Sequence, residues 1–419
     1  MLSQQSLRIT TKIAASPARF ASLWAGVPEG PADPILGLTE AWRKDPSPAK
    51  INVGVGAYRD ANGKAFVLPS VRKAEAIIAG KNLDKEYASI EGHADFRSAA
   101  LKFALGKDLF KDVHAATVQS ISGTGALRLG GEFLRRFHRK PEVALPDRTW
   151  PTHDKILNAA GVSTSSYRYY DASTISLNFK AMVEDLTQRA PGSAVLLHAC
   201  AHNPTGIDPT QAQWEELAQV FKTQKLLPFF DMAYQGFASG DPSRDAFAVR
   251  HFVQQGLHPI LTQSFAKNMG LYGERVGAFT VLCETAAEAS AVLSQLKLII
   301  RPMYSSPPIN GARIATHILN TPELTAEWEG ELKLMSGRII EMRETLVKEL
   351  KAAGSTKNWD FITKQIGMFC YSGMTAKHVQ ELREKHSIYM TSDGRISMVG
   401  LTHANVGALA RAMHAVTKA

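Results

Sequence analysis

The feature that most constrains the fold is an alternation of short β-rich runs with longer helical stretches between residues 117 and 283. It predicts helices such as 126–137, 211–223 and 245–255, and strands at 117–121, 143–145, 163–169, 194–199, 227–230, 260–263 and 278–282. Strands that alternate with helices typically form a mostly parallel sheet covered by helices on both faces. The sequence therefore predicts an α/β fold around such a sheet.

The remainder of the chain indicates a second, smaller α/β domain. Helices are expected at 310–319 and 322–353, followed by strand-like segments at 367–371 and 395–400 and helices at 375–385 and 403–416. The segment 51–55 is a candidate strand of the same domain. We divide the chain into residues 22–65 as an arm and part of the small domain, 66–334 as the large domain and 335–419 as the small domain.

Residues 1–21 differ in composition from the rest of the chain. They contain Arg8, Lys12 and Arg19 with several Ser and Thr, and the first acidic residue is Glu29. Such a segment is typical of a mitochondrial transit peptide, and it lacks the continuous apolar core of a secretory signal. We therefore expect cleavage near residues 20–22 and a location in the mitochondrial matrix, with a plain disordered tail as the alternative.

Charge, cysteines and hydropathy exclude several classes of protein. The formal charge is +9, but Lys and Arg are scattered along the chain, so we expect no nucleic-acid partner, while an acidic substrate would fit. The cysteines, Cys200, Cys283 and Cys370, are far apart and show no metal-ligand spacing, so we expect neither a metal site nor a disulfide. No apolar run reaches the roughly 18–20 residues that span a bilayer.

Polar residues follow several predicted strands where ligands bind in open α/β sheets, at the carboxyl ends. These are Ser122-Gly123-Thr124, Asn203, Asp231 with Tyr234, and Lys267. A desolvated lysine has a lowered pKa, and its neutral amine can form a Schiff base with the aldehyde of pyridoxal 5′-phosphate.

The other groups that this cofactor needs occur at the same edge. Asp231 is of the right type to keep the pyridinium nitrogen protonated. Residues 122–124 open a helix, whose N-terminus can bind the phosphate together with Ser264 and Arg275. A dinucleotide fingerprint starting at Gly123 is excluded, because Arg128 stands where it requires glycine.

With these residues assembled, the chain resembles the pyridoxal-phosphate-dependent class I aminotransferases, and among them the mitochondrial aspartate aminotransferases. The resemblance extends from Trp24 to Lys418 and includes INVGVGAYRD, SGTGALR, LLHACAHNPTGIDP, FFDMAYQGFASGD, AKNMGLYGERVGAF, IIRPMY and MTSDGRISMVG. It implies the fold of that family and a reversible, ping-pong transfer of the amino group from L-aspartate to 2-oxoglutarate. It also implies a homodimer with shared active sites.

The resemblance also implies roles for individual residues. Lys267 would hold the cofactor and shuttle the proton, Asp231 would pair with the ring nitrogen, and Tyr234 and Asn203 would bind the phenolic oxygen. Trp150 would stack on the ring, and the phosphate would be held by Ser122, Gly123, Thr124, Ser264, Arg275 and Tyr87 of the partner subunit.

For the substrate, the resemblance implies Arg395 at the α-carboxylate and Arg301, from the other subunit, at the side-chain carboxylate. Two arginines suit a dicarboxylate, since a guanidinium pairs with a carboxylate through two hydrogen bonds. Gly56 would lie in the segment that closes over substrate, and Gly206 would line the site. Trp150 and Asn203 would also contact substrate.

Some alternatives remain open at this stage. His153 and His198 are similar to residues that support the ring-nitrogen aspartate, but a structural role is equally compatible, so they are left out of the catalytic set. Arg148 stands where the family usually has a proline after a cis peptide bond, and the sequence after Tyr87 also departs from the family. There are two rival interpretations. One is an aminotransferase that prefers aromatic substrates, and the other is a non-catalytic protein that keeps the fold.

Overall fold

The central element of the computed structural model, which describes residues 22–30, 36–54 and 56–418, is a seven-stranded sheet. Its strand order is β2 (His114–Ile121), β10 (Val276–Cys283), β9 (Ile260–Ser264), β8 (Leu227–Met232), β7 (Ala194–His198), β3 (Glu142–Pro146) and β4 (Ser163–Tyr167). Only β10 runs antiparallel to its neighbours, β2 and β9. The predicted α/β class with a mostly parallel sheet is confirmed. The predicted transit peptide, residues 1–21, lies outside the described residues.

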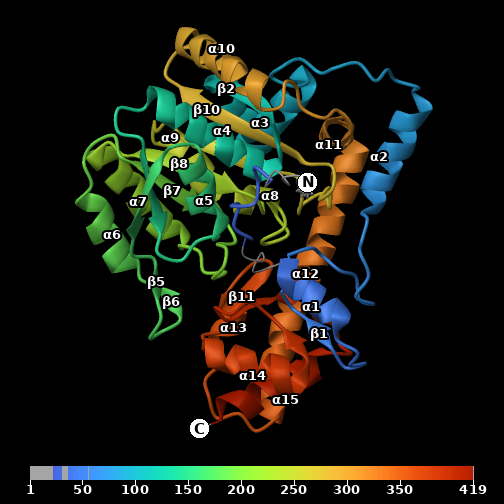
Figure 1. The fold of residues 1–419 in the computed structure, drawn as a ribbon. Coiled ribbons are helices and arrows are strands. Elements are labelled where there is room, and N and C mark those ends of the chain that lie inside the picture. The colour runs from blue at the N-terminus through green and yellow to red at the C-terminus, as the bar shows by residue number, and fades with distance from the viewer. Residues whose placement is uncertain (1–21, 31–35, 55, 419) are drawn as a thin grey trace, which may run out of the picture.

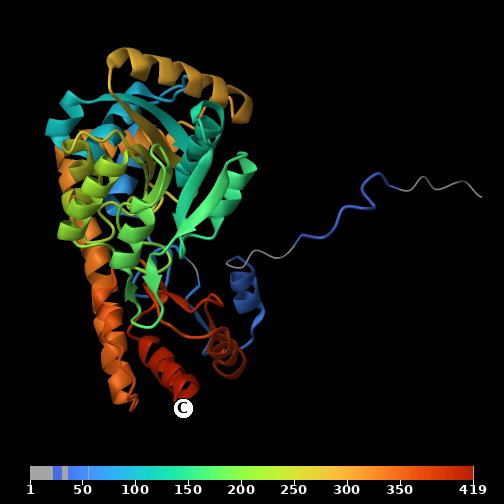
Figure 2. The ribbon, with the colours of Figure 1, turned by 90° about the vertical axis from the view of Figure 1, so that its left-hand side faces the viewer.

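Helices cover both faces of this sheet (Figures 1 and 2). On one face lie α4 (Ser122–Phe137), α5 (Thr152–Ala159) and α10 (Ala286–Met303), and on the other α3 (Ala94–Asp112), α6 (Phe179–Thr187), α7 (Gln211–Gln224) and α9 (Phe247–Gln254). Successive strand residues alternate between the two cores: Leu196 and Phe229 belong to the first, and Leu197 and Phe230 to the second. The strands are therefore apolar on both faces, which produces the continuous runs seen in the sequence.

The second part of the molecule lies at the far end of the long helix α12 (Pro322–Ala352) (Figure 1). It contains α1 (Leu36–Lys44), α13 (Phe361–Lys364), α14 (Ala376–His386) and α15 (Val406–Thr417). β1 (Ile51–Asn52) pairs parallel with β12 (Ile388–Tyr389), so the early segment joins this part as expected. β11 (Phe369–Tyr371) pairs antiparallel with β13 (Arg395–Ser397). The predicted domain boundary at 334/335 falls inside α12 and stays a prediction.

Some predicted boundaries were wrong. The strand predicted at 163–169 ends at Tyr167, and the chain continues into a hairpin of β5 (Tyr170–Asp171) and β6 (Ser176–Leu177). The helix predicted at 245–255 is two helices, α8 (Pro242–Asp245) and α9, because Ala246 departs from helical geometry between them. The strand predicted at 395–400 ends at Ser397 and becomes a 3-10 helix, Met398–Gly400.

Helices α2 (Pro69–Gly80) and α11 (Asn310–Asn320) also belong to the large part of the molecule. Among the described residues, no helix is both long enough and apolar enough to cross a membrane.

Candidate active site

A cavity of about 190 Å³ opens at the carboxyl ends of the parallel strands. Residues following β2, β3, β7, β8 and β9 reach it, and Arg275 enters from the start of the antiparallel β10, at the same edge. It is lined by Gly56, Ser122, Gly123, Thr124, Leu127, Trp150, His198, Cys200, Asn203, Asp231, Ala233, Tyr234, Ser264, Lys267, Arg275 and Arg395. The polar residues that the strand ends predicted are thus brought together in one place.

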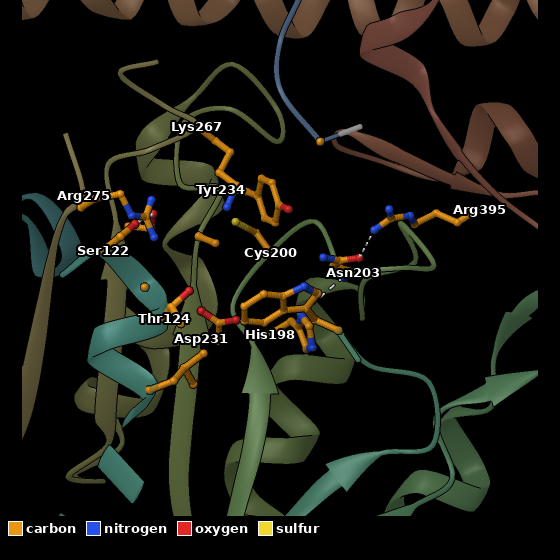
Figure 3. A pocket seen from close by; sticks show the side chains of 16 residues that line it. Ser122, Thr124, His198, Cys200, Asn203, Asp231, Tyr234, Lys267, Arg275 and Arg395 are labelled. Carbon is orange, nitrogen blue, oxygen red and sulfur yellow. Dashed lines mark hydrogen bonds between the residues drawn. The ribbon is translucent and has the colours of Figure 1, made fainter. Parts of the chain in front are cut away.

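One side of the cavity is built to hold an anion. Ser122, the first residue of α4, has a left-handed φ of +56°, and its hydroxyl lies 3.0 Å from that of Ser264. Gly123 lies so close to Ser264 that an added Cβ would be 3.3 Å from the serine Cβ. Figure 3 shows Arg275 next to Ser122, with Thr124 on the same side of the cavity. Hydroxyls, a cation and a helix N-terminus are the usual ligands of a phosphate group.

Lys267 projects into the middle of the cavity after β9 (Figure 3). Its Nζ lies 5.4 Å from the centre of the Tyr234 ring. Burial, with the nearby Arg275 charge, lowers the pKa of Lys267, while Asp231 opposes the shift. The next residue fixes the turn, since the Asn268 side chain donates to Gln235 O at 3.1 Å. A lysine amine with a lowered pKa is available as a nucleophile and as a base.

Asp231, at the end of β8, is connected to a row of polar side chains. Its Oδ2 lies 3.0 Å from His153 Nε2, and Thr149 Oγ1 lies 2.8 Å from His153 Nδ1 and 2.9 Å from His198 Nε2. The Asn203 backbone N–H points to His198 Nδ1 at 3.4 Å. Since that N–H can only donate, His198 Nδ1 must accept, so His198 carries its hydrogen on Nε2 and donates it to Thr149 Oγ1. The Thr149 hydroxyl then donates to His153 Nδ1, and His153 donates from Nε2 to Asp231.

The His198 imidazole is neutral in this arrangement. Burial lowers the pKa of His198 to about 3, which agrees with its accepting role. Burial raises the pKa of Asp231, but the hydrogen bond from His153 opposes the effect of burial, and the net pKa is lowered. Asp231 therefore remains a carboxylate facing the cavity. The two histidines that the sequence left outside the catalytic set support this aspartate.

Arg395, from β13, lies at the opposite side of the cavity from Arg275 (Figure 3). Its side chain is buried, Nη1 donates to Asn203 Oδ1 at 3.4 Å, and Nη2 donates to Gly54 O at 3.1 Å. The guanidinium stands over the Phe369 ring at 4.1 Å from its centre, and the buried Nε has no partner among the described residues. A buried cation with spare donors beside a cavity is suited to a carboxylate.

Two predicted site residues do not line the cavity of this single chain. The Tyr87 residue is 90% exposed, and Arg301 is exposed near the end of α10, where Nη1 donates to Ser305 Oγ at 2.7 Å. A third, Gly206, was also expected to line the site but is not among the cavity-lining residues; it packs against the small part, where an added Cβ would be 2.7 Å from Phe369 O. Leu127, Cys200 and Ala233 were not anticipated, since apolar and small residues carry no chemical signal in a sequence.

The backbone shows which peptide isomer the chain adopts at Arg148, where the family usually has a proline after a cis bond. Among the described residues the only cis peptide bond is Asn203–Pro204, so the bond before Arg148 is trans. Trp150 nevertheless reaches the cavity and packs edge-on against His153, with ring centres 5.3 Å apart.

The cavity fits pyridoxal phosphate. It offers an anion site at residues 122–124 with Ser264 and Arg275, an amine with a lowered pKa at Lys267, and a carboxylate at Asp231. These are the three groups that the phosphate, the aldehyde and the ring nitrogen of this cofactor require.

Comparison with known proteins agrees with this chemistry. The chain is 56% identical to the mitochondrial aspartate aminotransferase of Gallus gallus over 100% of both chains, and 53% identical to that of Dictyostelium discoideum over 94% of this chain and 93% of the relative. Among solved structures, a mitochondrial aspartate aminotransferase of Trypanosoma brucei matches with a TM-score of 0.87 and 44% identity, covering 91% of this chain and 100% of that one.

A second solved structure shows the cofactor. An aromatic-amino-acid aminotransferase of Burkholderia pseudomallei, covalently bound to pyridoxal phosphate, matches with a TM-score of 0.92 and 44% identity over 95% of this chain and 100% of that one. The family model for aminotransferase class I and II matches residues 48–413. This chain is therefore a member of the class I and II aminotransferase family, which uses pyridoxal phosphate.

Proposed function

We propose that this chain is an aspartate aminotransferase, which reversibly transfers the amino group of L-aspartate to 2-oxoglutarate and yields oxaloacetate and L-glutamate. The observation that carries the proposal is the arrangement in one cavity of Lys267, Asp231 and Arg395. The similarity to relatives named aspartate aminotransferase supports the choice of substrates.

When bound, pyridoxal phosphate supplies an aldehyde that condenses with amino groups and a ring that withdraws electrons from the substrate Cα. Asp231, kept as a carboxylate by His153, holds the ring nitrogen protonated. Lys267, with its lowered pKa, would remove the Cα proton as a general base and deliver it to the C4′ carbon of the cofactor. Arg395 holds the α-carboxylate and thereby orients the Cα–H bond toward Lys267.

The reaction follows a ping-pong order, in which oxaloacetate leaves before 2-oxoglutarate binds. The same residues serve both half-reactions, because aspartate and glutamate differ only by one methylene between their two carboxylates. Asn203 and Tyr234 line the cavity and would bind the phenolic oxygen of the cofactor, and Trp150 would provide an aromatic face.

The side-chain carboxylate requires a second cation, and we assign it to Arg301 of a second copy of this chain. Arg301 and Tyr87 are both exposed in the single chain, which is consistent with their serving a neighbouring site. Leu298, 65% exposed one turn before Arg301, adds apolar surface for such a contact. The proposed assembly is a twofold-symmetric homodimer, and we place it in the mitochondrial matrix.

Substrate preference tests this function. The purified holoenzyme should show a kcat/KM for aspartate far above that for phenylalanine, and an Arg301→Leu variant should lose the advantage while Arg411→Leu, an exposed arginine on α15, keeps it. A higher kcat/KM for phenylalanine in the unaltered enzyme would favour the aromatic class, to which the Burkholderia pseudomallei structure belongs. No absorbance change on adding aspartate would reject transamination.

The dimer has its own test. Activity should fall when the enzyme is diluted until sizing shows monomers, because each site would lose Arg301 and Tyr87 of the partner subunit. Full activity in a monomeric fraction would contradict shared sites.

A further inference from the structure

A short hairpin from the large part of the molecule contacts the small part at two points. β5 and β6 pair antiparallel, and the hairpin extends toward β11 (Figures 1 and 2). At its base, the Tyr170 ring meets the Tyr371 ring edge-on, with centres 5.2 Å apart and planes at 89°. In its turn, Ile175 lies so close to Gly373 that a Cβ added to the glycine would be 2.7 Å from Ile175 Cδ1.

The contacted strand supports the buried arginine of the site. In the β11–β13 ladder, Tyr371 is the residue directly paired with Arg395. At the other end of the same strand, the Phe369 ring lies under the Arg395 guanidinium at 4.1 Å. The position of β11 therefore determines where the Arg395 side chain stands in the cavity.

β11 is attached to the large part of the molecule at both ends. Before the strand, Ile366 N–H donates to Gly206 O at 2.7 Å, and Gly367 has no room for a Cβ against Ala201. After the strand, the hairpin provides the attachment through Tyr170 on Tyr371. Loss of the hairpin contact would leave the strand attached to the large part of the molecule at one end only, while the Tyr371 backbone stays hydrogen-bonded to Gln365 within the small part.

The hairpin contact is uncharged at neutral pH. Burial, and next the neighbouring Tyr371, raise the pKa of Tyr170 to about 12, although the Arg148 charge acts in the opposite direction. Burial likewise raises the pKa of Tyr371, again against Arg148. The interaction is thus a packing contact between two neutral rings, and its strength depends on shape and not on ionisation.

We infer that Tyr170 and Tyr371 are positioning residues, whose ring contact fixes β11 and so holds Arg395 where it meets the α-carboxylate of the substrate. This inference rests on the proposed function. Neither tyrosine lines the cavity, so each acts only through Arg395. The effect should therefore appear in substrate binding and not in the chemical step.

The test is a double-mutant cycle on Tyr170→Ala and Tyr371→Ala in the holoenzyme, measured with aspartate and with alanine as amino donors. An aromatic pair is worth a KM increase of about two- to tenfold, and both donors should be affected equally because both carry the α-carboxylate. The kcat should stay near the unaltered value. The double variant should be no worse than either single variant, since both remove the same contact.

Two further variants separate positioning from a general loss of structure. Tyr170→Phe keeps the ring and should retain the unaltered KM, while Phe247→Ala removes a half-buried aromatic of a ring pair on α9 and should leave KM unchanged. Ile175→Ala, at the hairpin turn, should raise KM in the same direction, so the inference remains testable if the buried Tyr371 variant fails to fold.

An unchanged KM in Tyr170→Ala, a Tyr170→Phe variant as impaired as Tyr170→Ala, or additive effects in the cycle would each overturn the inference. These results are distinct from a failure of the proposed function, in which the unaltered enzyme itself would not transaminate aspartate.

Discussion

Replacing Arg395 with lysine tests most directly how the substrate is held. The guanidinium uses Nη1 for Asn203 and Nη2 for Gly54, and it is packed on the Phe369 ring. Lysine at this position keeps a positive charge but has no planar pair of donors, so it cannot form hydrogen bonds to both oxygens of a carboxylate at once. The variant isolates geometry from charge.

The magnitude follows from the loss of one charge-assisted hydrogen bond. Such a bond contributes about 1.5–3 kcal/mol in a buried site, which corresponds to a fall in kcat/KM of about 10- to 100-fold. The buried ammonium would also leave Gly54 O and Asn203 Oδ1 with fewer donors. We expect the larger part of the loss in KM, because Arg395 contacts the α-carboxylate before and after the proton moves.

The assay is the single half-reaction with an amino acid, followed by the absorbance of the holoenzyme. Arg395→Lys should lower kcat/KM for aspartate and for alanine by the same factor, since both have an α-carboxylate. Arg301→Lys is the matched control, which should lower kcat/KM for aspartate and leave kcat/KM for alanine unchanged. If Arg395→Lys lowers the rate with aspartate and not with alanine, the assignment of Arg395 to the α-carboxylate is wrong.

Three further perturbations have definite outcomes. Lys267→Ala should abolish turnover while the cofactor still binds through the anion site, measured by activity and by absorbance after desalting. Asp245→Asn tests a buried carboxyl whose pKa is raised by burial to about 6. Because the folded state binds this proton more tightly than the unfolded state, the unaltered protein should lose up to about 3 kcal/mol of unfolding free energy, relative to the variant, as the pH rises from about 4 to about 7. Urea unfolding at both pH values measures this difference. Arg343→Leu should lower unfolding free energy by about 3–5 kcal/mol, because the buried guanidinium donates to three carbonyl oxygens, those of Ile362, Gly367 and Phe369, and thermal unfolding would show it.

The parts of the fold that could be predicted are those in which local pattern and tertiary environment agree. β7 and β9 are buried along their whole length, and their apolar runs were visible without any structure. The hairpin of β5 and β6 was missed because each strand has only two residues, too few for a periodic pattern. The break in α3 at Gly106 also involves a distant residue, since Arg250 from α9 donates to the carbonyl oxygens of Phe103 and Ala104.

The convergence of the polar residues at one cavity could be expected for a geometric reason. Parallel strands place their carboxyl ends at one edge, so residues as distant in sequence as Ser122 and Lys267 converge once the strand order is known. Arg395 does not follow from this rule, because it comes from a separate two-stranded sheet. Only the motif around it, and the family that the motif resembles, pointed to its role.

The state of Asp231 could not be deduced from residue types, because it depends on the direction of a hydrogen-bonded row. A single backbone group determines that direction: the N–H of Asn203 can only donate, and its donation to His198 orients Thr149 and then His153 toward the carboxylate. Had the row begun at a carbonyl, His198 would donate from Nδ1, and His153 could donate to Asp231 only as a cation or by breaking the row. The conformation of the loop after β7 thus keeps His198 neutral, with Nδ1 as an acceptor, and leaves the negative charge on Asp231, where the ring nitrogen of the cofactor requires it.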